Sequence, residues 1–312
     1  MSASLVLETR GLTKQYGALT AVADLSLAVQ EGEILGFLGP NGAGKTTSIN
    51  MMCGLLRPDS GQVLIHGLPV QGGDRKIRTR VGVCPQETIV WDKLTCLEQL
   101  EFMGEMYALP RKQARRRALE LLERVELREK ARELGSRLSG GMRRRLNLIL
   151  ALVHDPEVLV LDEPEAGLDP QSRVLVREYI RSLARRKTVI LTTQNMDEAE
   201  RLADRVAIID HGRLLVVDTP EALKGTVGEG DILELEMEGH TSRETGEVLR
   251  RFELDISLGD RNLSLRGRGV VKHLNEILEA LEAAGAPVKE VRLRSCTLED
   301  VFLALTGRRL RE

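Results

Sequence analysis

Residues 39–47 read GPNGAGKTT and carry the most specific signal in the chain. It matches the phosphate-loop pattern G-x-x-x-x-G-K-[ST], with Gly39, Gly44, Lys45 and Thr46 at the specified positions. The apolar run ILGFL before it predicts a buried strand, and the segment after it can begin a helix. The stretch therefore has the strand-to-helix context in which successive backbone N–H groups bind a polyphosphate.

Each residue type in this loop has a chemical role. Glycines at 42 and 44 let the backbone approach phosphate oxygens closely. Lys45 supplies a point charge for the β and γ phosphates, and Thr46 supplies a hydroxyl for Mg²⁺. The sequence therefore predicts a nucleotide-binding loop. We expect nucleotide contacts from Gly39, Asn41, Gly42, Ala43, Gly44, Lys45, Thr46 and Thr47.

Two further motifs lie downstream of the loop. Residues 138–142 read LSGGM, and residues 158–164 read VLVLDEP. The second is an aliphatic strand ending in two acidic residues, so we expect Asp162 at the mouth of a parallel sheet, holding Mg²⁺ through water. Glu163 beside it is a candidate general base. An acidic pair after a buried strand is costly unless it meets a cation.

In the order of these motifs the chain resembles the ATP-binding cassette (ABC) ATPases, from residue 5 to about residue 220. The shared elements are Tyr16 in KQYGALTAV, the phosphate loop, Gln86 in VGVCPQE, LSGGM, VLVLDEP, AGLD ending at Asp169, and VILTTQN with Gln194. Other phosphate-loop classes lack LSGG. Near the C-terminus, TLEDVFLALTG is similar to the tail of the drug-resistance (daunorubicin-type) exporter branch.

The resemblance implies an enzyme that hydrolyses ATP to ADP and phosphate, with ATP and Mg²⁺ bound together. It implies that Tyr16 stacks on adenine. The implied catalytic residues are Glu163 as general base, Lys45, Gln86 and Gln194. The implied metal-binding residues are Thr46, Gln86 and Asp162.

The LSGGM motif places a hydroxyl and free N–H groups at the start of a helix, where an anion would be stabilised. The chain's own phosphates are already held by the phosphate loop. The resemblance therefore implies a head-to-tail dimer, in which Ser139, Gly140 and Gly141 of one chain complete the ATP site of the other, with Asp169 also near the nucleotide. The alternative is an ordinary helix N-cap with glycines for close packing.

Three residues depart from the family pattern. Gln194 stands where the family usually has a histidine. Because an amide cannot carry a proton, we expect slower hydrolysis while ATP binding survives. Met142 replaces the glutamine that usually ends the signature. Glu165 and Ala166 replace a hydroxyl pair, which predicts added charge near the dimer interface.

Composition excludes several classes of function. The net charge is −2 and the pI about 6.3, so there is no global attraction to nucleic acid, and the arginine runs 111–117 and 143–145 are interpreted as solvated helix faces. The four cysteines form no C-x-x-C pair and fit small core residues in a reducing cytosol. No apolar run reaches about 18 residues and no leader is visible, so we expect neither a membrane span nor secretion.

Two domains are predicted, in an α/β class. Residues 1–225 should form a P-loop NTPase (RecA-like) domain with a mainly parallel sheet, an antiparallel β layer carrying Tyr16, and a helical insertion at about residues 87–155. Residues 226–312 should form a small α+β accessory or regulatory domain, whose βαββαβ order is the ferredoxin-like pattern.

These observations together predict the ATP-hydrolysing subunit of a membrane ABC transporter, and we expect that transporter to be an exporter. It would be peripheral on the cytoplasmic face of the cell membrane. We expect it to bind separate membrane-spanning permease subunits and either a second copy of itself or a similar ATPase subunit, and not to bind nucleic acid. Trp91, the only tryptophan, either lines a groove for a partner's helix or belongs to the core.

Two alternatives stay open. One is a soluble ABC ATPase acting mechanically on ribosome or DNA, although such chains usually carry two cassettes or a long coiled coil, which this one lacks. The other is an ATP-binding regulator with weak hydrolysis, which Gln194 alone favours.

Overall fold

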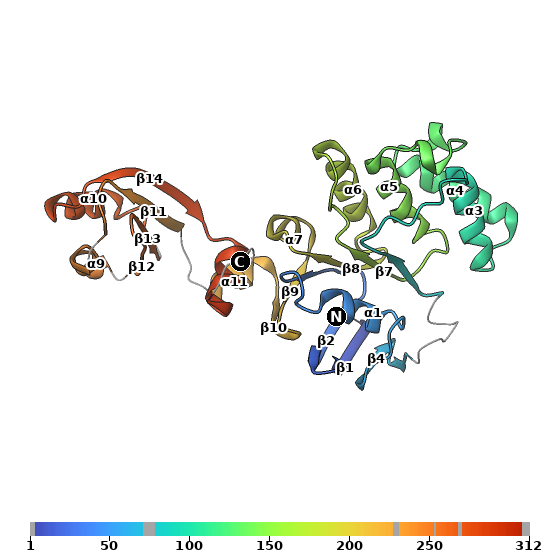
Figure 1. The fold of residues 1–312 in the computed structure, drawn as a ribbon, viewed down its shortest axis with the longest axis horizontal. Coiled ribbons are helices and arrows are strands. Elements are labelled where there is room, and N and C mark those ends of the chain that lie inside the picture. The colour runs from blue at the N-terminus through green and yellow to red at the C-terminus, as the bar shows by residue number, and fades with distance from the viewer. Residues whose placement is uncertain are drawn as a thin grey trace. The chain divides into compact units, whose positions relative to one another are not determined.

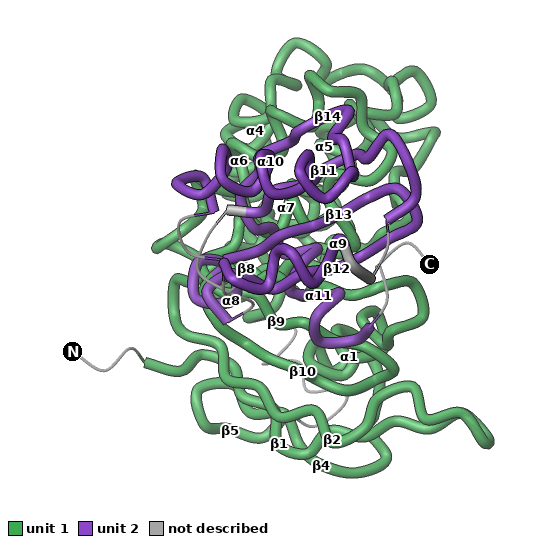
Figure 2. The backbone as a smooth tube through the Cα atoms, turned by 90° about the vertical axis from the view of Figure 1, so that its left-hand side faces the viewer, with its two compact units in different colours: residues 1–219, 311 green, residues 220–310, 312 purple. Residues whose placement is uncertain are grey.

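The computed structural model describes residues 4–70, 79–226, 231–241, 243–252, 254–267 and 270–307. The chain divides into two compact units, Met1–Thr219 and Pro220–Leu310 (Figures 1 and 2). The division falls a few residues before the boundary predicted at 225, because α8 (Pro220–Thr226) packs against α11 (Leu298–Thr306) of the second unit.

The first unit is built on a six-stranded sheet in the order β10-β9-β3-β8-β7-β6. Its strands are β3 (Ile34–Leu38), β6 (Val81–Cys84), β7 (Val158–Asp162), β8 (Thr188–Thr193), β9 (Arg205–Asp210) and β10 (Arg213–Asp218). All neighbours pair in parallel except β10, which is antiparallel to β9. Every residue of β3, β7 and β8 is buried, as expected for parallel strands covered on both faces. The predicted mainly parallel sheet is confirmed.

The predicted antiparallel layer is a second sheet of this unit, in the order β2-β1-β4-β5. Its strands are β1 (Leu5–Tyr16), β2 (Leu19–Gln30), β4 (Ser60–Ile65) and β5 (Leu68–Pro69). Buried side chains such as Leu7 and Val22 join a core cluster with Phe37 of β3 and Ile49 of α1. The layer thus covers one face of the phosphate-loop strand and places Tyr16 at the end of β1.

Helices of the first unit include the predicted helical insertion, drawn in green shades in Figure 1. The insertion contains α3 (Cys96–Met106), α4 (Arg111–Arg124) and α5 (Gly140–Leu150), with 3-10 turns at Arg128–Lys130 and Gly135–Arg137. The other described helices of this unit are α1 (Lys45–Met52), α6 (Pro170–Leu183) and α7 (Met196–Leu202). α3, α4 and α5 pack through Leu100, Leu121 and Leu146. Thr95 begins α3 with a capping box to Glu98.

The second unit has a four-stranded antiparallel sheet in the order β12-β13-β11-β14. Its elements are β11 (Asp231–Met237), α9 (Arg243–Leu249), a 3-10 turn (Arg250–Phe252), β12 (Asp255–Leu258), β13 (Asn262–Arg266), α10 (Leu274–Ala283), β14 (Val288–Ser295) and α11. Leu233 and Leu265 on one sheet face pack with Ile277 and Leu281 of α10. The predicted βαββαβ order is confirmed, and the strand order is that of a ferredoxin-like fold.

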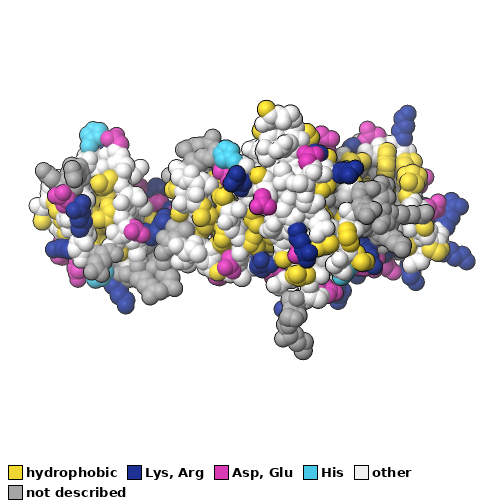
Figure 3. Space-filling view, turned by 90° about the horizontal axis from the view of Figure 1, so that it is seen from below, with side chains coloured by type: hydrophobic (Ala, Val, Ile, Leu, Met, Phe, Trp, Pro, Cys, Tyr) yellow, Lys and Arg dark blue, Asp and Glu magenta, His cyan; other side chains and the backbone are white. Residues whose placement is uncertain are grey.

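The surface of the described residues carries both signs of charge. Figure 3 shows lysine or arginine and aspartate or glutamate side chains along the whole of one face. No helix in the described parts of the chain combines the length and the apolar character of a membrane span.

Candidate functional site

The phosphate loop lies between β3 and α1, as its sequence predicts. Gly44 has a φ of 96°, and a Cβ there would lie 2.3 Å from the carbonyl oxygen of Ala21, so only glycine fits. The turn between β9 and β10 supports the loop, because the N–H of Gly212 donates to the carbonyl of Ala43 at 3.0 Å. The loop is therefore held by contacts from distant parts of the chain.

Lys45 lies inside this loop. Its ammonium donates to the carbonyls of Gly39 and Pro40 at 2.8 and 3.0 Å, and the residue is 6% exposed. Burial lowers the pKa of Lys45, and the carboxylates of Glu163 and Asp162 oppose this shift. The ammonium is thus positioned beside both acidic residues, where a phosphate chain lying along the loop would meet it.

Asp162, the last residue of β7, meets the predicted metal-binding hydroxyl. Its Oδ2 accepts from Thr46 Oγ1 at 3.2 Å, and its Oδ1 accepts from the hydroxyl of Thr192 on β8. A hydroxyl and a carboxylate are oxygen ligands of the kind Mg²⁺ prefers. The described residues hold no group of three His, Cys, Asp or Glu side chains that could bind a metal.

Glu163 adopts an unusual backbone conformation. Its φ of 46° lies in the left-handed region, which costs a non-glycine residue roughly 1–3 kcal/mol and persists only where neighbours enforce it. Its N–H donates to the carbonyl of Thr192 at 3.1 Å, and its Oε2 accepts from Gln86 Nε2 at 3.0 Å. Glu163 lines the cavity described next.

A cavity of about 520 Å³ joins these groups. The predicted residues that line it are Tyr16, Asn41, Gly42, Gly44, Lys45, Thr46, Thr47, Gln86 and Glu163. Tyr16 is 51% exposed, so its ring is free to stack on a flat ligand, and Lys14 Nζ lies 5.8 Å from the ring centroid. The lining residues that sequence analysis missed are Leu19, Thr20, Ala21, His211 and Gly212. Their approach to the phosphate loop depends on packing between segments that are distant in the sequence, such as the contact of Gly212 with Ala43.

The remaining predicted residues do not line this cavity. Ser139 caps α5, accepting from the N–H of Met142 at 3.3 Å, and Ser139 and Gly140 are exposed. Asp169 caps α6 and accepts from the N–H of Ser172 at 2.9 Å, a bond that lowers the pKa of Asp169. A Cβ on Gly141 would lie 2.3 Å from Ser172 Oγ. The LSGGM motif and Asp169 therefore lie together, at the starts of two adjacent helices.

Gln194 is exposed and stands between β8 and α7. The N–H of Asn195 donates to Thr193 Oγ1 at 2.8 Å, and the Asn195 side chain caps α7 by accepting from the N–H of Glu198 at 3.2 Å. The N–H of Gly39 donates to the carbonyl of Thr193 at 3.4 Å. The backbone around Gln194 is thus held to the phosphate loop on one side and to α7 on the other.

Glu198 is a buried acid in this network. Thr193 Oγ1 donates to its Oε2 at 2.6 Å, while its Oε1 is buried with no hydrogen-bond partner in the described structure. Burial raises the pKa of Glu198 to about 7; the carboxylates of Glu165 and Glu163 add to the shift, and Arg177 and the Thr193 hydroxyl oppose it.

Comparison with known proteins agrees with this geometry. A family model described as ABC transporter matches residues 22–166. The daunorubicin resistance ATP-binding protein DrrA3 of Streptomyces coeruleorubidus is 39% identical over 311 residues, covering 97% of this chain and 96% of its own length. The chain belongs to the ABC transporter ATP-binding proteins.

Other relatives and solved structures extend the comparison. Nod factor export ATP-binding protein I of Ralstonia nicotianae is 39% identical over 308 residues, covering 98% of this chain and 95% of its own. The structure of cbiO1 from Clostridium perfringens, part of the ABC transporter complex cbiONQ, has a TM-score of 0.66 at 25% identity and covers 72% of this chain and 93% of its own. A dimeric ATP-binding cassette bound to ADP and Pi has a TM-score of 0.63 at 27% identity, covering 68% and 98%.

Arg144 of this ABC ATP-binding subunit was missed, because the run 143–145 looked like a solvated helix face. That interpretation is wrong for Arg144, which is 3% exposed, and for Arg145, which is 8% exposed. The Arg144 guanidinium donates at 2.7–3.1 Å to the carbonyls of Pro85, Gln86, Asp162, Glu163 and Pro164. It therefore joins the signature helix α5 to the backbone that carries three of the predicted catalytic and metal residues.

Glu165 also differs from expectation. The sequence predicted added charge near the dimer interface, but the carboxylate is 4% exposed and receives two hydrogen bonds from Arg177, at 2.8 and 2.6 Å. Arg173 Nε lies 3.9 Å away. The charge of Glu165, two residues after Glu163, is therefore neutralised within the same chain by arginines of α6.

Proposed function

We propose that this chain is the ATP-hydrolysing subunit of an ABC exporter. The observation that carries the proposal is the cavity that brings together Lys45, Gln86 and Glu163, with Tyr16 exposed beside them. The hydrogen bond between Thr46 and Asp162 adds a site for the metal of Mg-ATP. The relatives named for daunorubicin resistance and for Nod factor export favour export as the direction of transport.

The residues divide the chemistry among them. Tyr16 stacks on the base, and the loop N–H groups with Lys45 hold the phosphates. Thr46, Asp162 and Gln86 would hold Mg²⁺, which when bound neutralises charge on the phosphates. Glu163 accepts a proton from the attacking water, and its hydrogen bond from Gln86 orients the carboxylate.

The proposed dimer is head to tail. Ser139 and Gly140 are exposed at the positive end of α5, outside the chain's own cavity, so they are available to an ATP bound by another copy or by a similar ATPase subunit. Gly141 and Asp169 lie against Ser172 beside them. The likeness to a dimeric cassette holding ADP and Pi supports this arrangement.

A second cavity of about 540 Å³ offers a place for the permease. Its exposed apolar lining includes Leu55, Ile89 and Trp91, with Met103 and Tyr107 deeper in. Trp91 is 37% exposed and packs edge-on against Phe102. We propose that an apolar segment of a separate membrane-spanning subunit binds here and holds the chain at the cytoplasmic face of the cell membrane.

Gln194 holds the position of the switch histidine in this proposal. Its amide can donate to the γ phosphate but cannot carry a proton, so ATP binding survives and the chemical step is slower. The C-terminal unit supplies pairing or regulation, since every residue that lines the described nucleotide cavity belongs to the first unit.

Glu163→Gln tests the function. Removal of the base should lower kcat at least about a hundredfold while ATP binding persists, and should trap an ATP-bound dimer. Glu120→Gln, an exposed change on α4, is the matched control and should leave both unchanged. A Glu163→Gln chain that remains as active as the parent would exclude the proposed base. A chain that shows no ATP-dependent association at saturating ATP and Mg²⁺ would exclude the sandwich dimer.

A further inference from the structure

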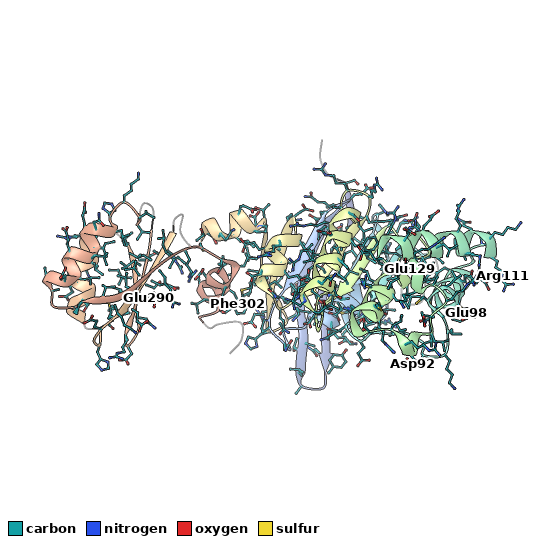
Figure 4. All side chains as sticks on the ribbon, turned by 90° about the horizontal axis from the view of Figure 1, so that it is seen from above. Asp92, Glu98, Arg111, Glu129, Glu290 and Phe302 are labelled. Atoms are coloured by element: carbon teal, nitrogen blue, oxygen red, sulfur yellow. The ribbon has the colours of Figure 1, made fainter. Side chains whose placement is uncertain are left out.

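Strand β14 lies at the edge of the four-stranded sheet in the second unit, with β11 as its neighbour. Two of its apolar side chains are open to solvent, Val291 at 40% and Leu293 at 49%. Figure 4 shows the position of Glu290 on this strand. An edge strand presents unpaired backbone N–H and C=O groups, which form a template for another strand.

Charged side chains usually guard such edges, but here their order is self-complementary. Glu290 and Arg292 are two residues apart, share one face of the sheet, and form an exposed ion pair at 2.7 Å. If a second copy is related by a two-fold axis perpendicular to the sheet, each face stays on its own side. Residues that meet across the axis must then be both even-numbered or both odd-numbered.

One symmetric register satisfies the charges. With Val291 at the centre, Glu290 of each chain lies opposite Arg292 of the other, and Val291 lies opposite Val291. A shift to a centre at Glu290 would oppose two glutamates, and a shift to Arg292 would oppose two arginines. The ion pair between Glu290 and Arg292 within each strand can exchange for pairs across the axis, because an exposed ion pair contributes little stability in water.

The remaining arginine of the same face is already fixed. Arg294 donates to Glu234 at 2.8 Å and to Asp300 at 2.7 Å, so the C-terminal end of β14 is tied to its own sheet and to α11. This leaves Glu290, Val291 and Arg292 as the part of the edge free to meet another strand.

We propose that β14 pairs antiparallel with β14 of a second copy of this chain, with Val291 opposite Val291, joining the two four-stranded sheets. This interface is separate from the nucleotide sandwich and does not involve ATP. It would keep two ATPase chains together when neither holds nucleotide.

Disulfide trapping tests the register in the full chain. Opposed Cα atoms in an antiparallel pair lie about 4.5–5.5 Å apart, within disulfide reach, so Val291→Cys should cross-link to itself on mild oxidation. Leu293→Cys is the matched control, because its two copies would be separated by about 13 Å along the strands. Both variants carry Lys45→Ala, which removes the ATP sandwich. The native cysteines Cys53, Cys84, Cys96 and Cys296 are buried and contribute little background.

The expected result is cross-linking at 291 at least about tenfold faster than at 293 in nucleotide-free protein. Equal rates, or no cross-link at either position, would overturn the proposal. A product at 291 in membranes that contains a protein of different mass would overturn it too, because the edge would then belong to another partner.

A charge reversal gives an independent measure. Arg292→Glu opposes glutamates at both symmetry-related pairs and should weaken nucleotide-free dimerisation by about tenfold in sedimentation velocity. The double variant Glu290→Arg with Arg292→Glu restores opposite charges and should return to within about threefold of the parent. Circular dichroism checks that both remain folded. If the double variant is as weak as the single one, the proposed register is wrong.

Discussion

The buried ion pair between Glu165 and Arg177 allows a direct test of what stabilises the loop that contains Glu163 and Glu165. Arg177 on α6 donates two hydrogen bonds to the carboxylate, at 2.8 and 2.6 Å, and these bonds raise the pKa of Arg177. Glu165 follows Glu163 in the same loop. Replacement of Arg177 by methionine keeps an unbranched chain of similar length and leaves the glutamate buried without its main partner.

The loss of stability caused by Arg177→Met can be estimated in two ways. Hydrogen bonds to charged groups contribute roughly 1.5–3 kcal/mol each, and removal of one member of a buried pair costs about 3–5 kcal/mol. Arg173, 3.9 Å from the carboxylate, compensates in part. We therefore expect a loss of about 3 kcal/mol in the free energy of unfolding.

Urea unfolding followed by the fluorescence of Trp91 measures this loss, because the only tryptophan lies in the first unit. The double variant Glu165→Gln with Arg177→Met should recover most of the stability, since it buries no unpaired charge. A single variant within about 1 kcal/mol of the parent, or a double variant as unstable as the single, would refute the reasoning.

Three further outcomes follow from the site. Lys45→Ala should weaken ATP binding at least about a hundredfold in calorimetry, because it removes the cation that faces the phosphates; an unchanged Kd would contradict this role. Gln194→His should raise kcat by about ten- to a hundredfold with little change in ATP affinity. If the parent and the variant have equal rates, both with the permease present and with it absent, Gln194 does not limit turnover. Because burial raises the pKa of Glu198 to about 7, the folded chain binds its proton more tightly than the unfolded chain, so this stability is present at pH 4.5 and lost as pH rises through 7. Glu198→Gln should therefore stabilise the first unit by about 3 kcal/mol at pH 8 and not at pH 4.5 in urea unfolding; a gain that does not depend on pH would exclude titration of this carboxyl as its cause.

Much of the fold could be predicted because its signals are local. The run ILGFL before the phosphate loop has no polar residue, which is the pattern of a strand covered on both faces, and β3 is buried throughout. The order of elements in the second unit likewise followed from alternation and helical periodicity along single segments. Several residues of the cavity could be predicted from the loop alone, because its glycines, Lys45 and Thr46 lie within a few residues of one another in the sequence.

The contacts that position the site residues could not be predicted from such local patterns. Arg144 looked like one charge in a solvated run, yet its five acceptors come from two strand ends that are distant in sequence from α5 and from each other. The burial of Glu165 depends on Arg177, which lies about two turns into α6. The sequence shows only that both charges exist. His211 reaches the cavity because its turn packs on the phosphate loop. Each of these contacts depends on which segments pack together in the folded chain, and the periodicity of a single segment does not predict that.

The Arg144 contacts link the two halves of the proposed reaction within one chain. α5 begins with Ser139 and Gly140, which in the proposed dimer meet the ATP of the other copy, and the same helix holds the carbonyls of Asp162, Glu163 and Gln86. A shift of α5 alone would leave these carbonyls buried without their donor, at roughly 1–3 kcal/mol for each. The helix and the catalytic backbone should therefore move as one body. Contact of α5 with one ATP would then be felt at the base and metal residues that act on the other.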